Sequence, residues 1–153
     1  MITAGLVQTL ASEIKECLKK IKLPTEYMRE PTEPVQVNVF EQYLPADLFE
    51  QTSYYPCVVV EWLKTEDDLK AGSVMTIGLT IGVYAKEADG YLDAFHIMEV
   101  IRQRLLSKRT IGKKYRLIKE ATWETPNEQP TPFFFVVAEL MYSNYLVQEE
   151  FPA

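Results

Sequence analysis

The sequence predicts an α+β fold, with a mixed or antiparallel sheet of about five strands and two long helices packed on one of its faces. Residues 74–86 alternate between apolar and small or polar side chains, and this period of two is typical of a strand. Residues 3–22 and 91–107 repeat their apolar side chains at steps of three and four, which indicates amphipathic helices. The apolar face of such a helix must be buried against another element, and a sheet can provide that surface.

The first predicted helix covers residues 3–22. Thr3 can cap its start, and Pro24 ends it because a proline disfavours the helical conformation of the residue before it. Its apolar side chains form one stripe that we expect to face the core, namely Leu6, Leu10, Ile14, Leu18 and Ile21.

Three strands are predicted between the two helices. A proline-containing connector at 27–34 leads to a strand at 35–40, and a short helical turn at 44–53 leads to a strand at 55–63. The alternating segment described above is the third strand. Residues 64–72 are mostly polar and include three adjacent acids, so we expect them to form a mobile loop that joins strands two and three into an antiparallel hairpin.

The second half of the chain adds a helix and two strands. A turn at 87–90 begins the second helix, whose sheet-facing side chains we expect to be Tyr91, Phe95, Met98, Ile101 and Leu105. Strands at 115–123 and 133–146 follow, separated by a proline-containing loop at 124–132. The predicted element order is therefore α-β-β-β-α-β-β.

Length and composition indicate one soluble domain over residues 1–153. Apolar residues make up 47% of the chain and charged residues 25%, and no apolar run approaches the ~20 residues that span a bilayer. The start of the sequence lacks the basic and apolar blocks of a signal peptide, so we expect synthesis inside the cell. The net charge of −6 argues against a nucleic-acid groove, which needs a basic surface.

The sequence offers little chemistry. Cys17 and Cys57 have no second cysteine or histidine at metal-ligand spacing, and we expect two buried reduced thiols. No catalytic or nucleotide-binding motif is present, so we expect no catalytic residue, no cofactor and no metal. The polar flank of the second helix, with His96, Glu99 and Gln103, is the only candidate for a small-ligand or enzymatic site.

Charge is unevenly distributed along the chain. The charged residues within 41–70 are mostly acidic and include Glu66, Asp67 and Asp68, whereas those within 102–119 are all basic and include Arg102 and Arg104. A solvated loop and a solvated helix face would account for this pattern. Alternatively, the two stretches are complementary patches that meet between copies of the chain, since such patches steer and orient interfaces.

The predicted strands at 55–63 and 133–146 are apolar on both faces. Two helices can cover only one face of the sheet, so apolar side chains such as Phe133 and Phe135 need another cover. A second copy of the chain would provide it. We therefore expect an oligomer, with Glu66, Asp67, Asp68, Arg102, Arg104, Phe133 and Phe135 as interface residues.

The order of elements and three short segments resemble a known family. The segments are Tyr-Pro-Cys-Val-Val-Val at 55–60, Ala-Asp-Gly-Tyr-Leu-Asp at 88–93, and Gln-Pro-Thr-Pro-Phe at 129–133. Over roughly residues 1–147 the chain resembles the tail terminator, or tail-completion, proteins of long-tailed bacteriophages and prophages.

The resemblance implies a structural role without catalysis. Proteins of this family form a ring, commonly a hexamer, that ends the tail tube, stops further addition of tube subunits and helps join the tail to the head. The implied partners are further copies of the chain, the tail tube protein and the head–tail connector protein, with no membrane and no specific nucleic acid, although the genome passes through the ring. The implied location is the host cytoplasm during assembly and then the tail or neck of the virion.

Two alternatives remain open from the sequence. Another head–tail joining or neck protein would share the ring and the lack of chemistry. A small α+β ligand-binding or enzymatic domain belongs to a different class and would need a deep pocket with convergent polar groups.

Overall fold

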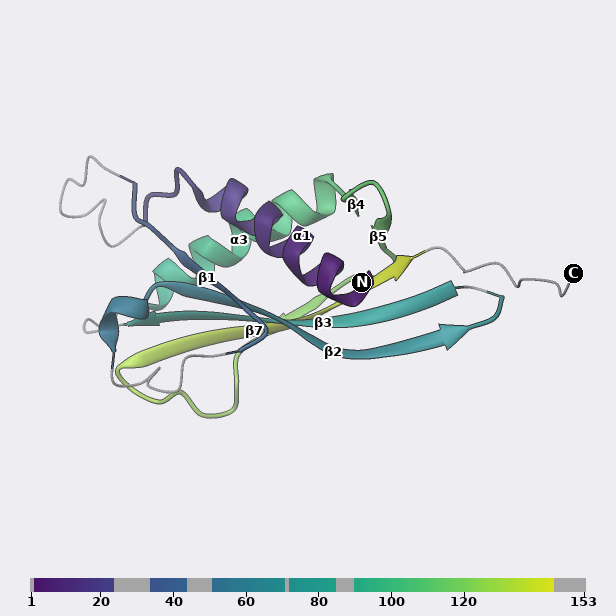
Figure 1. Ribbon diagram of the computed structural model, residues 1–153. Coiled ribbons are helices and arrows are strands. Elements are labelled where there is room, and N and C mark those ends of the chain that lie inside the picture. Colours follow the sequence, from purple (N-terminus) through teal and green to yellow (C-terminus); the bar gives the residue numbers. More distant parts are fainter. Residues whose placement is uncertain (1, 24–33, 44–50, 71, 85–89, 145–153) are drawn as a thin grey trace, which may run out of the picture.

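The computed structural model describes residues 2–23, 34–43, 51–70, 72–84 and 90–144. Two helices, α1 (Ile2–Leu18) and α3 (Tyr91–Ser107), lie together on one face of a mixed sheet, as Figure 1 shows. The predicted fold class is therefore confirmed. Most of the predicted connector (27–34), helical turn (44–53) and second turn (87–90) lies outside the described residues, as do the last two residues of the predicted final strand.

Within the described residues the sheet has seven strands rather than the predicted five. Their order across the sheet is β1-β2-β3-β7-β5-β4, and β6 also pairs with β7. β1 and β2 are parallel, and all other pairs are antiparallel. The strands are β1 (Asn38–Glu41), β2 (Cys57–Asp68), β3 (Gly72–Tyr84), β4 (Thr110–Ile111), β5 (Tyr115–Leu117), β6 (Thr122–Glu124) and β7 (Phe133–Asn144), with a short 3₁₀ helix, η1 (Thr52–Tyr54), before β2.

The predicted acidic loop at 64–72 is wrong for most of its length. β2 continues to Asp68, and Lys64 to Asp68 pair with Thr76 to Gly72 of β3. A bulge at Leu63 shifts the register, and beyond it the backbone ladder continues although the apolar alternation has ended. The sequence pattern does not predict this part of the strand because its side chains are charged and do not alternate with apolar ones. Main-chain pairing does not require apolar residues.

The predicted strand at 115–123 is divided in two. Leu117 of β5 lies opposite Tyr142, whereas Thr122 of β6 lies opposite Glu139. From Leu117 to Thr122 the chain advances by five residues, whereas the opposite strand advances by only three, from Glu139 to Tyr142. Two extra residues therefore lie outside the ladder between β5 and β6. The sequence also missed β4, which is only two residues long.

The main core lies between the helices and the sheet. The predicted stripe of α1 is buried from Leu6 to Leu18, and Ile21, just beyond the helix end, is buried too. In α3 the buried face is Ala94, Ile97, Ile101 and Leu105. Tyr91 and Phe95 meet the sheet only at its edge: they pack against each other and against Phe134 of β7, but they are 40% and 38% exposed and are not part of the buried face.

Leu10→Ala tests this packing. Leu10 is fully buried between α1 and the sheet, so its truncation should lower the free energy of unfolding by about 2–5 kcal/mol. Gln8→Ala, on the exposed side of the same helix, is the control and should change it by less than about 0.5 kcal/mol. Urea unfolding followed by circular dichroism measures both, and equal effects would contradict the assigned helix face.

Candidate interaction surface

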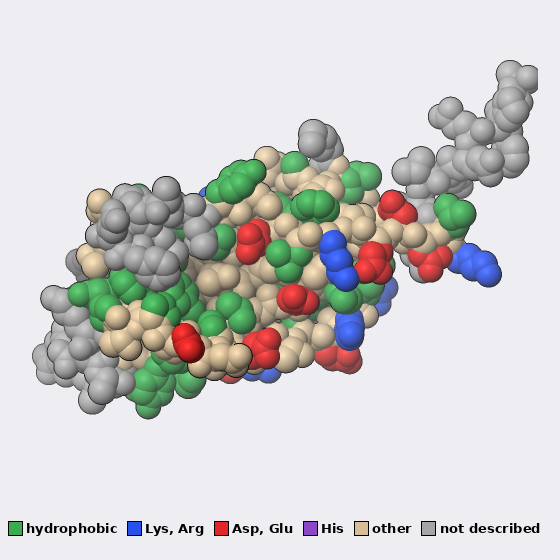
Figure 2. All heavy atoms as spheres, turned by 90° about the horizontal axis from the view of Figure 1, so that it is seen from below, with side chains coloured by type: hydrophobic (Ala, Val, Ile, Leu, Met, Phe, Trp, Pro, Cys, Tyr) green, Lys and Arg blue, Asp and Glu red, His purple; other side chains and the backbone are tan. Residues whose placement is uncertain are grey.

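The sheet face turned away from α1 and α3 is called here the open face. The strand register places Cys57, Val59 and Glu61 of β2 on it, opposite the even-numbered residues of β3 from Gly78 to Gly82. β7 adds Phe135, Val137 and Glu139. Figure 2 views this side and shows hydrophobic side chains gathered at one end and acidic ones spread over the middle.

The hydrophobic end of the open face is a second, smaller core. Tyr55, Cys57, Phe133 and Phe135 are at most 9% exposed, with Phe40, Tyr54 and Tyr84 packed around them. The rings of Tyr55 and Phe133 lie 4.8 Å apart between centroids. Phe133 and Phe135 are therefore covered by their own chain, and the premise that they need a second copy as cover does not hold at this end.

Two glutamine side chains form hydrogen bonds with the backbone of long strands at positions where a neighbouring strand is absent. Beyond β1, the amide of Gln42 accepts a hydrogen bond from the Trp62 backbone N–H at 2.8 Å and donates one to its C=O at 3.3 Å. Before β7, Gln129 does the same for Phe135, at 2.8 and 2.9 Å. Each side chain thus replaces one strand residue and satisfies the backbone of a long strand where its neighbouring strand is absent.

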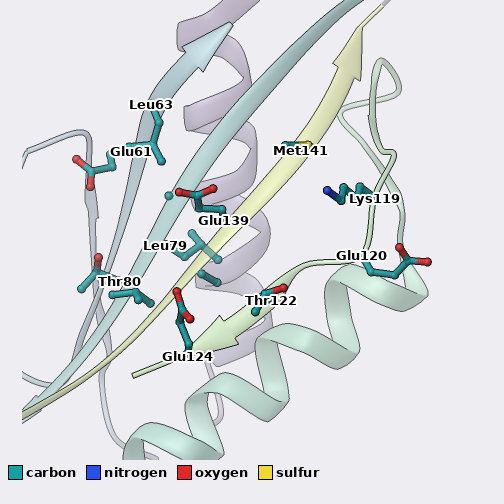
Figure 3. Close-up of a pocket in the computed structure, with 13 residues that line it drawn as sticks. Glu61, Leu63, Leu79, Thr80, Lys119, Glu120, Thr122, Glu124, Glu139 and Met141 are labelled. Atoms are coloured by element: carbon teal, nitrogen blue, oxygen red, sulfur yellow. The ribbon is translucent and has the colours of Figure 1, made fainter. Parts of the chain in front are cut away.

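The middle of the open face has an acid-lined hollow of about 330 Å³, drawn in Figure 3. Its carboxylates come from separate elements: Glu61 from β2, Glu139 from β7 and Glu124 from β6. Lys119 and Glu120, from the two-residue excess between β5 and β6, form another part of its wall. Leu63 contributes an apolar side chain that lies over Gly78.

The hollow carries an excess of negative charge. In the described part of the chain, no group of three potential ligand side chains could hold a metal ion. The hydrogen bond and charge of Glu66, with a smaller effect of Glu139, raise the pKa of the exposed Lys64 near this face. An excess of carboxylates around an apolar patch suits a basic or cationic partner.

The far end of the β2–β3 hairpin carries the predicted acidic interface residues. In Figure 1 this end extends beyond the layer of helices. Glu66 forms an exposed ion pair with Lys64 at 2.9 Å. Asp67 and Asp68 accept local hydrogen bonds, from the Ser73 hydroxyl at 2.6 Å and from the Lys70 backbone N–H at 2.7 Å. Leu69 next to them is 92% exposed.

Arg102 and Arg104, the predicted basic interface residues, have partners within the chain. Arg102 pairs with Glu99 at 2.9 Å, one turn away on α3. Arg104 pairs with Glu13 of α1 at 3.1 Å, and Lys108 reaches the other oxygen of the same carboxylate. Burial raises the pKa of Glu13, but the hydrogen bonds and charges of Lys108 and Arg104 outweigh it and hold that pKa below its usual 4.5.

Other basic side chains are gathered around the β4–β5 hairpin. These side chains are exposed and belong to the basic stretch at 102–119. The sequence pattern predicts the basic charge but does not predict that these residues share one edge of the sheet. They are Arg109, Lys113, Lys114, Arg116 and Lys119.

Of the residues named for a small-molecule site, His96, Glu99 and Gln103, only Gln103 lines a hollow between the two helices of the described chain. Glu99 is engaged with Arg102, and Gln103 lines an open hollow between α1 and α3 that also includes Cys17 and Arg104. Both cysteines are free thiols, with Cys57 buried and Cys17 half-buried, and burial raises the pKa of each to about 11. A thiol with so high a pKa is a poor nucleophile at neutral pH.

A scan of the sequence against protein-family models finds no match, and neither does a search of curated proteins. Among the described residues, no helix is long and apolar enough to cross a membrane.

Gly82→Ala tests the small core of the open face. A Cβ at Gly82 would lie 2.8 Å from the Phe135 ring and 3.0 Å from the Tyr55 ring, so the substitution should cost about 1–3 kcal/mol of stability through overpacking. Gly78→Ala is the matched control on the same strand and face. Its Cβ would meet only the end of the exposed Leu63 side chain, at 3.2 Å, and should cost less than about 1 kcal/mol. Chemical unfolding of both variants gives the comparison, and a larger loss for Gly78→Ala would contradict it.

Glu13→Gln tests the partly buried ion pairs between α1 and α3. A folded-state pKa below 4.5 means that the Glu13 charge stabilises the fold above pH 4.5, and that this contribution is lost as pH falls through the folded-state pKa. The parent should therefore be more stable than Glu13→Gln at pH 7, and the difference should shrink toward pH 3. Glu16→Gln, on the exposed side of α1, is the control. Urea unfolding at both pH values measures this, and a difference independent of pH would contradict it.

Proposed function

We propose that this chain is a structural subunit of a phage tail terminator ring. It ends the tail tube, blocks further addition of tube subunits and presents a surface to the head. The sequence resemblance supports this role, and so does an α+β fold in which a long hairpin extends beyond the helix layer. That projecting hairpin is the observation that carries the proposal, because it is an arm able to reach a neighbouring subunit.

The charges of the chain support a head-to-tail contact. The end of the hairpin is acidic and exposed, with Glu66, Asp67 and Asp68, whereas the β4–β5 hairpin is basic and exposed. Two unlike surfaces on one chain favour a heterologous contact, which closes into a ring when the rotation between copies permits.

The proposed partners follow from this role. They are five further copies of the chain, a number taken from the hexameric rings of the family that the sequence resembles, the tail tube protein and the head–tail connector protein. Carboxylates such as Glu61, Glu124 and Glu139 would repel the phosphates of a genome if their face lines the channel. The chain would assemble in the host cytoplasm and remain in the tail or neck of the virion.

A second candidate function rests on the acid-lined hollow. Its volume is in the range of small-molecule sites, and its carboxylates would attract a cationic ligand. In that case the chain is a small ligand-binding domain that works without forming a ring. A different head–tail joining or neck protein is a closer variant of the first proposal, and it would share the same assembly.

Multi-angle light scattering separates the two classes. We expect the purified chain to form particles of about six times its 17.7 kDa mass, either alone or after addition of the tail tube protein encoded in the same genome. High salt should weaken the assembly because exposed charges are screened. A chain that stays monomeric at every concentration and does not bind the tube protein would overturn the terminator proposal and favour the ligand-binding domain.

A further inference from the structure

The strand neighbours of β2 change along its outer edge. β1 pairs with β2 only from Cys57 to Val60, and the Gln42 side chain then occupies the edge at Trp62. In the described part of the chain, no strand pairs with the outer edge of β2 from Lys64 to Asp68. Edge strands of this kind are sites for the addition of a strand from another chain.

β4 forms the opposite edge of the same sheet. It is the last strand in the sheet order, and in the described residues its only strand partner is β5. Thr110 and Gly112 are exposed there, next to Arg109 and Lys113. The two edges therefore carry opposite charge, acidic on β2 and basic on β4.

The strand register places these edges at the same level of the sheet. Glu66 pairs with Val74, and Val74 pairs with Ser143. Ser143 pairs with Arg116, and Arg116 pairs with Thr110. One continuous row thus runs from acidic Glu66 at one edge to Thr110 at the other, with Arg116 one strand further in.

The strand directions are also compatible. Four pairings separate β2 from β4, and all four are antiparallel. Because an even number of reversals restores the direction, β2 and β4 run the same way along the sheet. Because alternate side chains of a strand share a face, Glu66 and Arg116 both lie on the open face. Pairing of two β2 edges would bring acids together, and pairing of two β4 edges would bring bases together.

We propose that the Lys64–Asp68 edge of one copy adds as a parallel strand to β4 of the next copy, with Glu66 beside Thr110 and within reach of Arg116. This contact rests on the proposed ring, and it names the two surfaces that build that ring. The sheet of one subunit then continues into the sheet of its neighbour, and main-chain pairing adds to the attraction between the charges. The occupant of the β2 edge is a second copy of this chain.

Charge exchange tests the proposal. Glu66→Lys and Arg116→Glu should each raise the dissociation constant of the assembly roughly tenfold, because each places like charges across the contact. The double variant should restore assembly. Lys15→Glu, on the exposed side of α1, is the control and should assemble like the parent. Sedimentation at low salt gives the dissociation constants, and circular dichroism checks that each variant is folded.

Cysteine cross-linking gives a second measurement that does not depend on charge. An equal mixture of Glu66→Cys and Thr110→Cys chains should form a disulfide-linked dimer on mild oxidation, since paired residues on neighbouring strands lie within disulfide range. A mixture of Glu66→Cys and Gln8→Cys chains should not, because Gln8 lies on the helix layer.

The outcomes separate this inference from the proposed function. A parent that assembles, together with charge variants that assemble equally well and no Glu66–Thr110 cross-link, would overturn the edge contact and leave the ring intact. A parent that never assembles, alone or with the tube protein, would overturn both.

Discussion

The pairing of β3 with strands on both sides is the constraint on which the rest of the structure depends. β3 contacts β2 from Gly72 to Gly82 and β7 from Ser73 to Tyr84. Its large apolar side chains face α1 and α3, whereas its glycines and threonines face the open side. The same strand thus anchors the helix layer and, at Gly82, leaves space for the rings of Tyr55 and Phe135.

The fold divides the charged residues into two groups. Glu13, Arg104 and Lys108 form ion pairs that tie α1 to α3, so these bases already have partners inside the subunit. Charges at the ends of the sheet are exposed, with acids at the β2 edge and bases around β4 and β5. The acids at the β2 edge have only local partners within the hairpin, so a second chain can approach this group without separating α1 from α3, and the assembly proposal rests on it.

The open face has two regions with different physical character. Its aromatic end is closed by the chain itself, whereas its middle keeps a hollow lined by glutamates from three strands. The surface and the two edges of the sheet are suited to contacts between macromolecules, and the structural role proposed here uses them in that way.

Local pattern by itself determined the alternation of β3 and β7, the buried stripe of α1 and the α+β class, because periods of two and 3.6 depend only on neighbouring residues. It missed the strand at Lys64–Asp68, the division between β5 and β6, and the exposure of Phe95, because each depends on which segment lies alongside. Tertiary structure alone decided that Glu13 engages Arg104, that Phe133 and Phe135 are buried, and that Glu66 and Thr110 share one row at opposite edges. These are contacts between residues far apart in sequence, and local periodicity carries no information about them.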